Sequence, residues 1–181
     1  MRLIRIVSTL LLLSLSGLLT SCTVNSTQLS TLQNTLTASD DALEPYRWRL
    51  SRAGYVAEVF AVTTDDGKTV FANEVDDWVA FDGWMITVVK GLGLTTGELV
   101  ITGAVGERWF SDGNWPLNKH YCDPWRASPE LQSTIYAQDC TGDQSYTNLI
   151  TVDRQGMIVK IQQNIGLEDT FSNNPLVLEK R

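Results

Sequence analysis

The sequence predicts a mainly β protein, an antiparallel β-sandwich or barrel-like meander that follows a signal peptide and a short polar tether. β-Branched and aromatic residues cluster in short runs from residue 55 onward, as they do in strands. Turn residues separate these runs at roughly the 8–12 residue spacing that is typical of sandwiches and barrels. No stretch with a strict helical period is longer than the tether.

The first 21 residues have the layout of a bacterial export signal. Arg2 and Arg5 precede an uncharged apolar run over residues 6–19, which is typical of such signals. A membrane-spanning helix needs about 20 apolar residues, so this run is a poor permanent anchor. Leu19-Thr20-Ser21-Cys22 ends the segment and resembles the bacterial lipobox. We therefore expect cleavage before Cys22.

The lipobox resemblance implies a diacylglycerol thioether on Cys22 and an acylated amino group. Each buried methylene contributes on the order of 0.8 kcal/mol, so several chains make the attachment effectively permanent. Thr23 follows the cysteine, whereas an Asp there signals retention at the inner membrane in enterobacteria-like lipoproteins. The expected location is the periplasmic face of the outer membrane.

Three parts are expected along the chain: the signal peptide over residues 1–21, a lipidated N-terminus and polar tether over 22–44, and a single antiparallel β domain over 45–181. Residues 23–39 carry no charge, and a coil of that length would reach about 20–25 Å. After cleavage the chain has 12 basic residues (14 less Arg2 and Arg5) and 21 acidic residues, which gives a net charge of −9. Such a surface repels nucleic acid, so no nucleic-acid partner is expected.

Strands are expected where apolar runs lie between turn residues, over residues 55–63, 68–73, 78–81, 84–89, 98–102, 107–110, 148–152 and 157–164. Asp82-Gly83 is the strongest short hairpin signal in the chain. Residues 176–178 suit a final short strand or the start of a helical tail. From Asp112 to Pro129 the chain is rich in Pro and Gly, which predicts a loop.

Cys122 and Cys140 remain after Cys22 is used, and in an oxidising compartment they should form a disulfide that staples this loop. This disulfide would close a loop of about 18 residues and stabilise the folded protein by roughly 3 kcal/mol. The alternative is a metal site with His120, but one His and two Cys lack a fourth ligand at the usual spacing. Neither a metal nor a cofactor is expected.

No constellation for nucleophilic catalysis is visible. The only histidine, His120, lies between Lys119 and Tyr121 in the predicted loop, and no Gly-x-Ser-x-Gly or phosphate-binding glycine loop occurs. Carboxylate pairs could serve glycoside chemistry, and the candidates are Asp76 with Asp77 and Asp112 with Glu107. Because acidic surface residues are common in so acidic a chain, we expect no enzymatic activity.

Six tryptophans are many for a chain of this length. Trp84 and Trp109 lie within strand patterns and are expected in the core. Trp115 and Trp125 lie in the predicted loop, where exposure is expected. Exposed aromatic faces stack on sugar rings, so Trp115 and Trp125 are the candidate contacts for a glycan or a partner.

A set of hairpin motifs carries a family resemblance: Pro45-Tyr46, Val59-Phe60-Ala61, Asp66-Gly67 with Phe71, Gly83, Thr87, Gly91-Leu92, Asn148, Val152-Asp153, Gly156 and Lys160 to Gln163. They lie in residues 45–93 and 148–170, which resemble the YjbF/GfcB family of lipoproteins associated with the export of exopolysaccharide and capsule. The segment from Cys122 to Cys140 departs from that pattern. The resemblance implies a non-enzymatic, β-rich periplasmic lipoprotein.

The expected function is that of an outer-membrane-anchored accessory in exopolysaccharide or capsule secretion or assembly. Its expected partners are the membrane, through the lipid, and polysaccharide export proteins or the polysaccharide itself. Two alternatives remain open: a glycan-modifying enzyme that uses two carboxylates, and a structural envelope lipoprotein with no sugar role.

Overall fold

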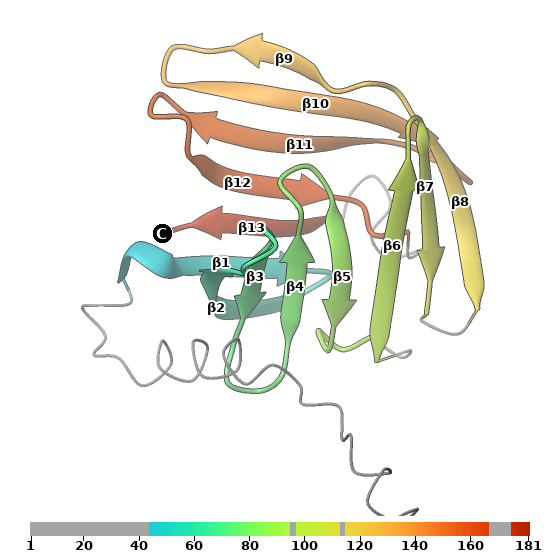
Figure 1. Ribbon diagram of the computed structural model, residues 1–181, viewed down its shortest axis with the longest axis horizontal. Coiled ribbons are helices and arrows are strands. Elements are labelled where there is room, and N and C mark those ends of the chain that lie inside the picture. The colour runs from blue at the N-terminus through green and yellow to red at the C-terminus, as the bar shows by residue number, and fades with distance from the viewer. Residues whose placement is uncertain (1–43, 95–96, 113–114, 167–174) are drawn as a thin grey trace, which may run out of the picture. The chain divides into compact units, whose positions relative to one another are not determined.

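Figure 1 shows a computed structural model that describes residues 44–94, 97–112, 115–166 and 175–181. These residues belong to the second of two compact units, residues 35–181. The expected signal peptide, Cys22 and nearly all of the polar tether lie outside the described residues. Among the described residues, no helix has the length and hydrophobicity that a bilayer crossing requires.

The described chain is one turn of 3-10 helix, η1 (Glu44–Tyr46), followed by antiparallel strands. In chain order these are β1 (Arg47–Arg52), β2 (Tyr55–Thr63), β3 (Thr69–Ala72), β4 (Trp78–Phe81), β5 (Ile86–Lys90), β6 (Glu98–Ala104), β7 (Glu107–Ser111), β8 (Pro116–Cys122), β9 (Arg126–Pro129), β10 (Ser133–Thr141), β11 (Ser145–Asp153), β12 (Ile158–Gln163) and β13 (Leu176–Lys180).

The strands form a closed antiparallel barrel, which confirms the predicted fold class. Neighbours follow the order β11-β12-β13-β1-β2-β3-β4-β5-β6-β7-β8-β10, and β10 also pairs with β11. The ring closes between β8 and β10 through two residue pairs, Cys122 with Cys140 and Tyr121 with Thr141. β9 pairs with β10 and lies outside the ring.

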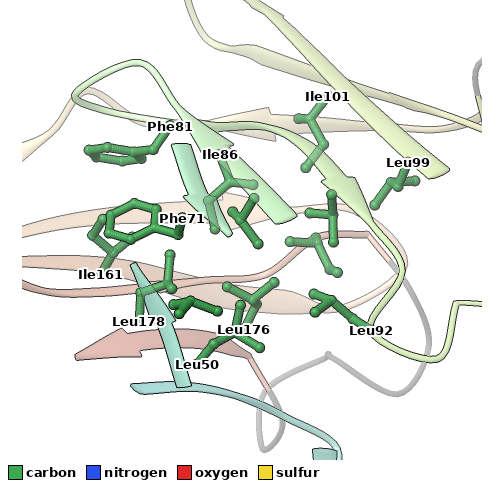
Figure 2. Packing of buried hydrophobic residues seen from close by; sticks show 14 of the residues in the cluster. Leu50, Phe71, Phe81, Ile86, Leu92, Leu99, Ile101, Ile161, Leu176 and Leu178 are labelled. Carbon is green, nitrogen blue, oxygen red and sulfur yellow. The ribbon is translucent and has the colours of Figure 1, made fainter. Parts of the chain in front are cut away.

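Alternate side chains of the strands meet inside the barrel (Figure 2). Leu50 of β1, Phe71 of β3, Ile161 of β12 and Leu178 of β13 are at most 2% exposed. The Trp48 and Phe71 rings meet edge to face, with centroids 4.9 Å apart. This alternation of buried and exposed residues is the period-2 pattern from which the strands were expected.

Several strands lie where the sequence predicts them. β2 and β4 have the expected bounds, and β3, β6, β7, β11, β12 and β13 differ by a few residues at their ends. β13 lies between β12 and β1, so residues 176–178 begin a central strand and no helical tail. β5 begins at Ile86, two residues later than expected.

The prediction of a loop from Asp112 to Pro129 is wrong, because this segment contains β8 and β9. Proline is compatible with a strand where its missing N–H is not needed. Pro116 is the first residue of β8, and Pro129 is the last residue of β9, a strand with one neighbour. The disulfide between Cys122 and Cys140 is present, but it joins two neighbouring strands at the closure of the ring.

Candidate functional site

A pocket of about 210 Å³ lies at one end of the barrel. The β4–β5 and β6–β7 turns both lie at this end (Figure 1), and the chain between β8 and β9 contributes Trp125. We call this hollow the end pocket; its lining includes Asp82, Trp84, Glu107, Arg108, Trp125 and Gln138. It is smaller than the roughly 300–1,000 Å³ of sites that enclose drug-sized ligands, so it suits one ring-sized group.

Aromatic side chains form one side of the end pocket. Trp84 is 48% exposed, and its ring centroid lies 5.6 Å from that of Trp125 and 5.2 Å from that of Tyr136. The prediction that Trp84 is a core residue is wrong, because Trp84 lies in the β4–β5 turn and not in the strand. Its exposed ring is therefore held by aromatic neighbours from β10 and from the β8–β9 connection.

The Asp-Gly turn explains why Trp84 occupies this position. The Asp82 carboxylate accepts hydrogen bonds from the backbone N–H of Trp84 (2.9 Å) and of Met85 (2.7 Å). Gly83 has a φ of +102°, which glycine adopts without steric penalty. The turn is thus defined by its own sequence.

Gln163 holds the same turn from across the barrel. Its side chain is fully buried, its amide donates to the carbonyl of Trp84 (2.7 Å), and its Oε1 accepts from the backbone N–H of Ile86 (3.1 Å). A strand on the far side therefore fixes the backbone on both sides of Met85.

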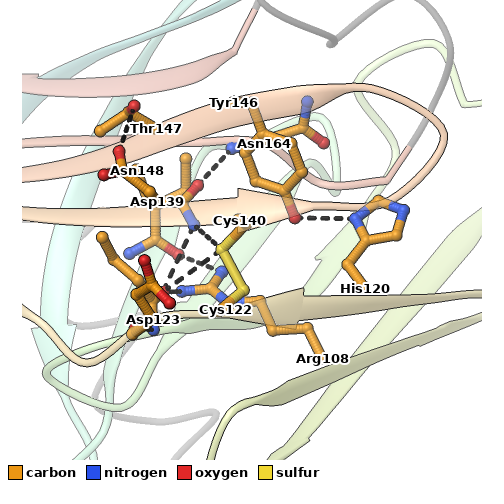
Figure 3. The surroundings of a disulfide bond; sticks show 12 residues. Arg108, His120, Cys122, Asp123, Asp139, Cys140, Tyr146, Thr147, Asn148 and Asn164 are labelled. Carbon is orange, nitrogen blue, oxygen red and sulfur yellow. Dashed lines mark hydrogen bonds between the residues drawn. A yellow bond between two sulfur atoms is a disulfide. The ribbon is translucent and has the colours of Figure 1, made fainter.

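Arg108 is the buried cation of the end pocket. It is 3% exposed; its Nη1 donates to Oε1 of Gln163 (3.1 Å) and its Nη2 to Oε1 of Gln138 (2.7 Å). Figure 3 shows Arg108 beside the disulfide and the amide side chains. Burial lowers the pKa of Arg108 to about 10, while Tyr146 and, to a lesser extent, Asp82 oppose that shift. Arg108 therefore keeps its positive charge at neutral pH.

The polar interior continues behind Arg108. Asn148, which is fully buried, donates to Oε1 of Gln138 (3.4 Å) and accepts from the backbone N–H of Asn164 (2.9 Å). Gln138 also donates to the carbonyl of Asp123 (3.0 Å). These bonds give the buried amides partners, which removes the large cost of burying them unpaired.

Glu107 lines the end pocket but is matched by a neighbouring cation. Its carboxylate lies 2.7 Å from Lys119 Nζ, and the Lys119 hydrogen bond lowers the pKa of Glu107. The same ammonium lies 4.5 Å from the ring centroid of Trp109 and 4.7 Å from that of Tyr121. Lys119, Trp109 and Tyr121 thus form an aromatic and cationic surface on the outer face of β7 and β8.

The structure separates the two tryptophans that were expected to contact a ligand. Trp125 is half-buried and lines the end pocket. Trp115 is 73% exposed but lies at the opposite end of the β7–β8 hairpin from Glu107. Trp109, expected in the core, is 43% exposed; that expectation is wrong because Trp109 points outward from β7, between the inward-facing Arg108 and Phe110.

The carboxylate pair Asp76 and Asp77 does not converge on one site. Asp76 is exposed and forms an ion pair with Lys90 (2.7 Å). Asp77 is buried and accepts hydrogen bonds from Tyr55, Asn73 and the backbone N–H of Leu92. Burial by itself would raise the pKa of Asp77, but these hydrogen bonds outweigh it and lower the pKa. Asp77 thus secures the chain after β5.

Asp112 and Glu107 are also held separately, at opposite ends of the strand β7. Asp112 accepts the backbone N–H of Trp115 (2.8 Å) at a turn, while Glu107 pairs with Lys119. A glycoside hydrolase needs one carboxyl group with a raised pKa as its general acid. The pKa values of Glu107 and Asp77 are both lowered, which does not suit that role.

His120 is a core residue of β8 and does not lie in a loop. It is 1% exposed, its Nδ1 lies 2.7 Å from the hydroxyl of Tyr146, and its ring centroid is 4.6 Å from that of Phe110. Burial lowers the pKa of His120. Within the described ranges, no group of three or more His, Cys, Asp or Glu residues has the arrangement of a metal site.

Sequence reasoning missed Arg108, Gln138 and Gln163. One signal could have identified Arg108: strand alternation places residue 108 on the same face as Phe110, so a charged side chain there points inward with it. No such signal existed for Gln163, because its partners in the β4–β5 turn are 77 and 79 residues away in the chain.

The comparisons with known proteins agree with the fold. No protein-family model matches the chain, and no curated protein matches it. The crystal structure of the hypothetical lipoprotein YmcC from Escherichia coli K12 is similar, with a TM-score of 0.53 and 11% identity, over 88% of this chain and 95% of that chain. The chain therefore shares its β fold with a protein described as a hypothetical lipoprotein.

Proposed function

We propose that this protein is a lipid-anchored lipoprotein of the outer membrane that binds polysaccharide at the end pocket, as a non-enzymatic accessory in exopolysaccharide or capsule secretion or assembly. The N-terminal lipobox supports the anchor. The hairpin motifs that resemble the YjbF/GfcB family support the link to polysaccharide export. The fold shared with a hypothetical lipoprotein agrees with the first of these.

The observation that carries the binding role is the exposed ring of Trp84 beside Trp125. Three features hold Trp84 outward: the Asp82 carboxylate, the Gln163 amide and the neighbouring aromatic rings. An aromatic ring held in place offers an apolar face at low entropic cost. The C–H faces of sugar rings pack on such faces, while polar groups in the same pocket bind the hydroxyls.

Binding is tested directly with purified mature domain and the organism's own secreted polysaccharide. Trp84→Ala and Trp125→Ala should each weaken binding at least tenfold, as measured by calorimetry or by quenching of tryptophan fluorescence. Tyr46→Ala is the matched control, because Tyr46 is a 51% exposed aromatic residue outside the pocket lining. Equal binding by wild type and Trp84→Ala would contradict the pocket assignment.

The role in export is tested in cells. Deletion of the gene should reduce surface or secreted polysaccharide while cytoplasmic precursor synthesis continues. Wild type and Tyr46→Ala should restore export, and Trp84→Ala should not. Normal polysaccharide export after deletion would instead favour a structural envelope lipoprotein with no sugar role.

The anchor is tested at Cys22. Cys22→Ser should abolish palmitate labelling and block the lipoprotein-specific cleavage, and wild-type protein should separate with the outer membrane on a density gradient. Labelled palmitate on Cys22→Ser protein would contradict the anchor, and wild-type protein in the inner membrane would contradict the interpretation of Thr23.

One observation favours the enzymatic alternative: Asp82 and Glu107 both line the end pocket. Asp82 is engaged by the N–H groups of the turn and Glu107 by Lys119, which suits structural roles. We therefore expect no release of reducing ends from the polysaccharide. Release that Glu107→Gln or Asp82→Asn abolishes would establish the enzyme and overturn the accessory role.

A further inference from the structure

The charge of Arg108 lacks a carboxylate partner within the described chain. The ion pairs of the described residues do not include Arg108. Its two hydrogen bonds go to neutral amides, those of Gln163 and Gln138. Arginine has five N–H donors in a planar fork, and these bonds use two of them. A buried cation is costly to desolvate unless an anion compensates it.

The other charges at the end pocket leave this cation uncancelled at close range. Glu107 is neutralised by Lys119 at 2.7 Å. Asp82 acts on Arg108 through space, but its carboxylate is bound by the N–H groups of Trp84 and Met85. The pocket thus contains a buried cation in a protein whose net charge is −7 as translated.

We infer that the end pocket binds an acidic sugar residue, whose carboxylate pairs with Arg108 while its ring packs on Trp84 and Trp125. This inference rests on the proposed function and names the class of glycan. A guanidinium binds a carboxylate through parallel N–H···O bonds, which neutral sugars cannot accept with the same strength. Low exposure of Arg108 strengthens that attraction, because water screens it poorly there.

Removal of the negative charge of Asp82 should raise the affinity for an acidic glycan. This negative charge acts on Arg108 through space, so it also opposes an incoming carboxylate. Asp82→Asn keeps an oxygen that accepts the N–H groups of Trp84 and Met85, so the turn is retained while the charge is removed. An acidic glycan should therefore gain affinity for this variant, and the gain should be larger than any change in the affinity for a neutral glycan.

The experiment uses a uronate-containing oligosaccharide and its carboxyl-reduced product, which differ in charge and share their linkages. Wild-type mature protein should bind the uronate form at least tenfold more tightly by calorimetry. Asp82→Asn should tighten binding of the uronate form severalfold. Glu98→Gln is the control. Ala104, at the end of β6, lines the end pocket, and Glu98 is an exposed carboxylate at the other end of this strand, about 20 Å away.

The substitution Arg108→Gln tests the opposite change, the loss of affinity for the uronate form. It should remove the preference for the uronate form while binding of the reduced form persists. If Arg108→Gln does not fold, the Asp82→Asn result decides the question. Equal affinity of wild type for the two forms would overturn the acidic-sugar assignment and leave the proposed function standing. Failure of both forms and of the native polysaccharide to bind would overturn the proposed binding role itself.

Discussion

The barrel interior has two regions that are stabilised in different ways. Around β1, β3, β12 and β13 it is apolar, with Leu50, Phe71, Ile161 and Leu178 at most 2% exposed. Toward the end pocket, β7, β10 and β12 contribute Arg108, Gln138 and Gln163, together with a disulfide. Apolar burial is non-directional and stabilises whatever excludes water. Hydrogen-bonded groups fix positions, which a binding site needs and a core does not.

The largest loss of stability is expected from the apolar region. Phe71→Ala should lower the free energy of unfolding by about 3–5 kcal/mol, because it removes a buried ring and leaves a cavity. Denaturant unfolding measures this loss. Phe60→Ala, on the half-buried side of β2, should cost clearly less. Equal costs for the two variants would contradict the assignment of Phe71 to the centre of the core.

Removal of the disulfide should have the next largest effect. Cys122 and Cys140 join β8 to β10, where two residue pairs close the ring. The double variant Cys122→Ala/Cys140→Ala should lose about 2–4 kcal/mol of stability. Hydrogen exchange should accelerate first in β8 and β10. Two reactive thiols in the wild-type protein, denatured without reducing agent, would contradict the disulfide.

Disruption of the Gln163 hydrogen bonds should act more locally than loss of the disulfide. Gln163→Leu leaves the Ile86 N–H, the Trp84 carbonyl and Nη1 of Arg108 without this side-chain partner, at about 1–3 kcal/mol per buried group. Exchange of the Ile86 amide and the emission of Trp84 should change. The neighbouring Gln162→Leu is the control, since that side chain points to the other face. An unchanged Trp84 environment in Gln163→Leu would contradict the role of Gln163 in positioning the turn.

The smallest effect is expected from pH. The folded-state pKa of His120 is lowered below the ordinary 6.5, chiefly by burial, so the unfolded chain binds a proton first as the pH falls. Stability should therefore be unaffected by this group above about 6.5 and decrease below it. Unfolding between pH 7.5 and 5.5 measures the slope, and His120→Gln should flatten it. His120 is the sole histidine. An equal slope in the variant would therefore contradict the attribution of this pH dependence to His120.

Much of the fold could be predicted from local pattern, although β1 and β10 were not among the predicted strands. Tyr55–Thr63 and Trp78–Phe81 have the expected bounds because alternation and flanking turn residues act over a few positions. β8 and β9 could not be recognised, since Pro116 and Pro129 suggest a loop unless it is known that their missing N–H groups fall at strand ends. The later start of β5 was not predicted either. The Asp82 side chain accepts a hydrogen bond from the Met85 N–H and so extends the turn through Met85.

Residue order along the chain was enough to indicate the antiparallel β class and the pairing of Cys122 with Cys140, and it predicts an export signal that ends before Cys22. These features depend on local periodicity, on residue type and on compartment. The tertiary structure alone brought Trp84, Arg108 and Trp125 to one pocket and placed Trp115 away from it. That outcome depends on closure of the barrel, which brings Gln163 to a turn almost eighty residues earlier and places Arg108 in the lining of the end pocket.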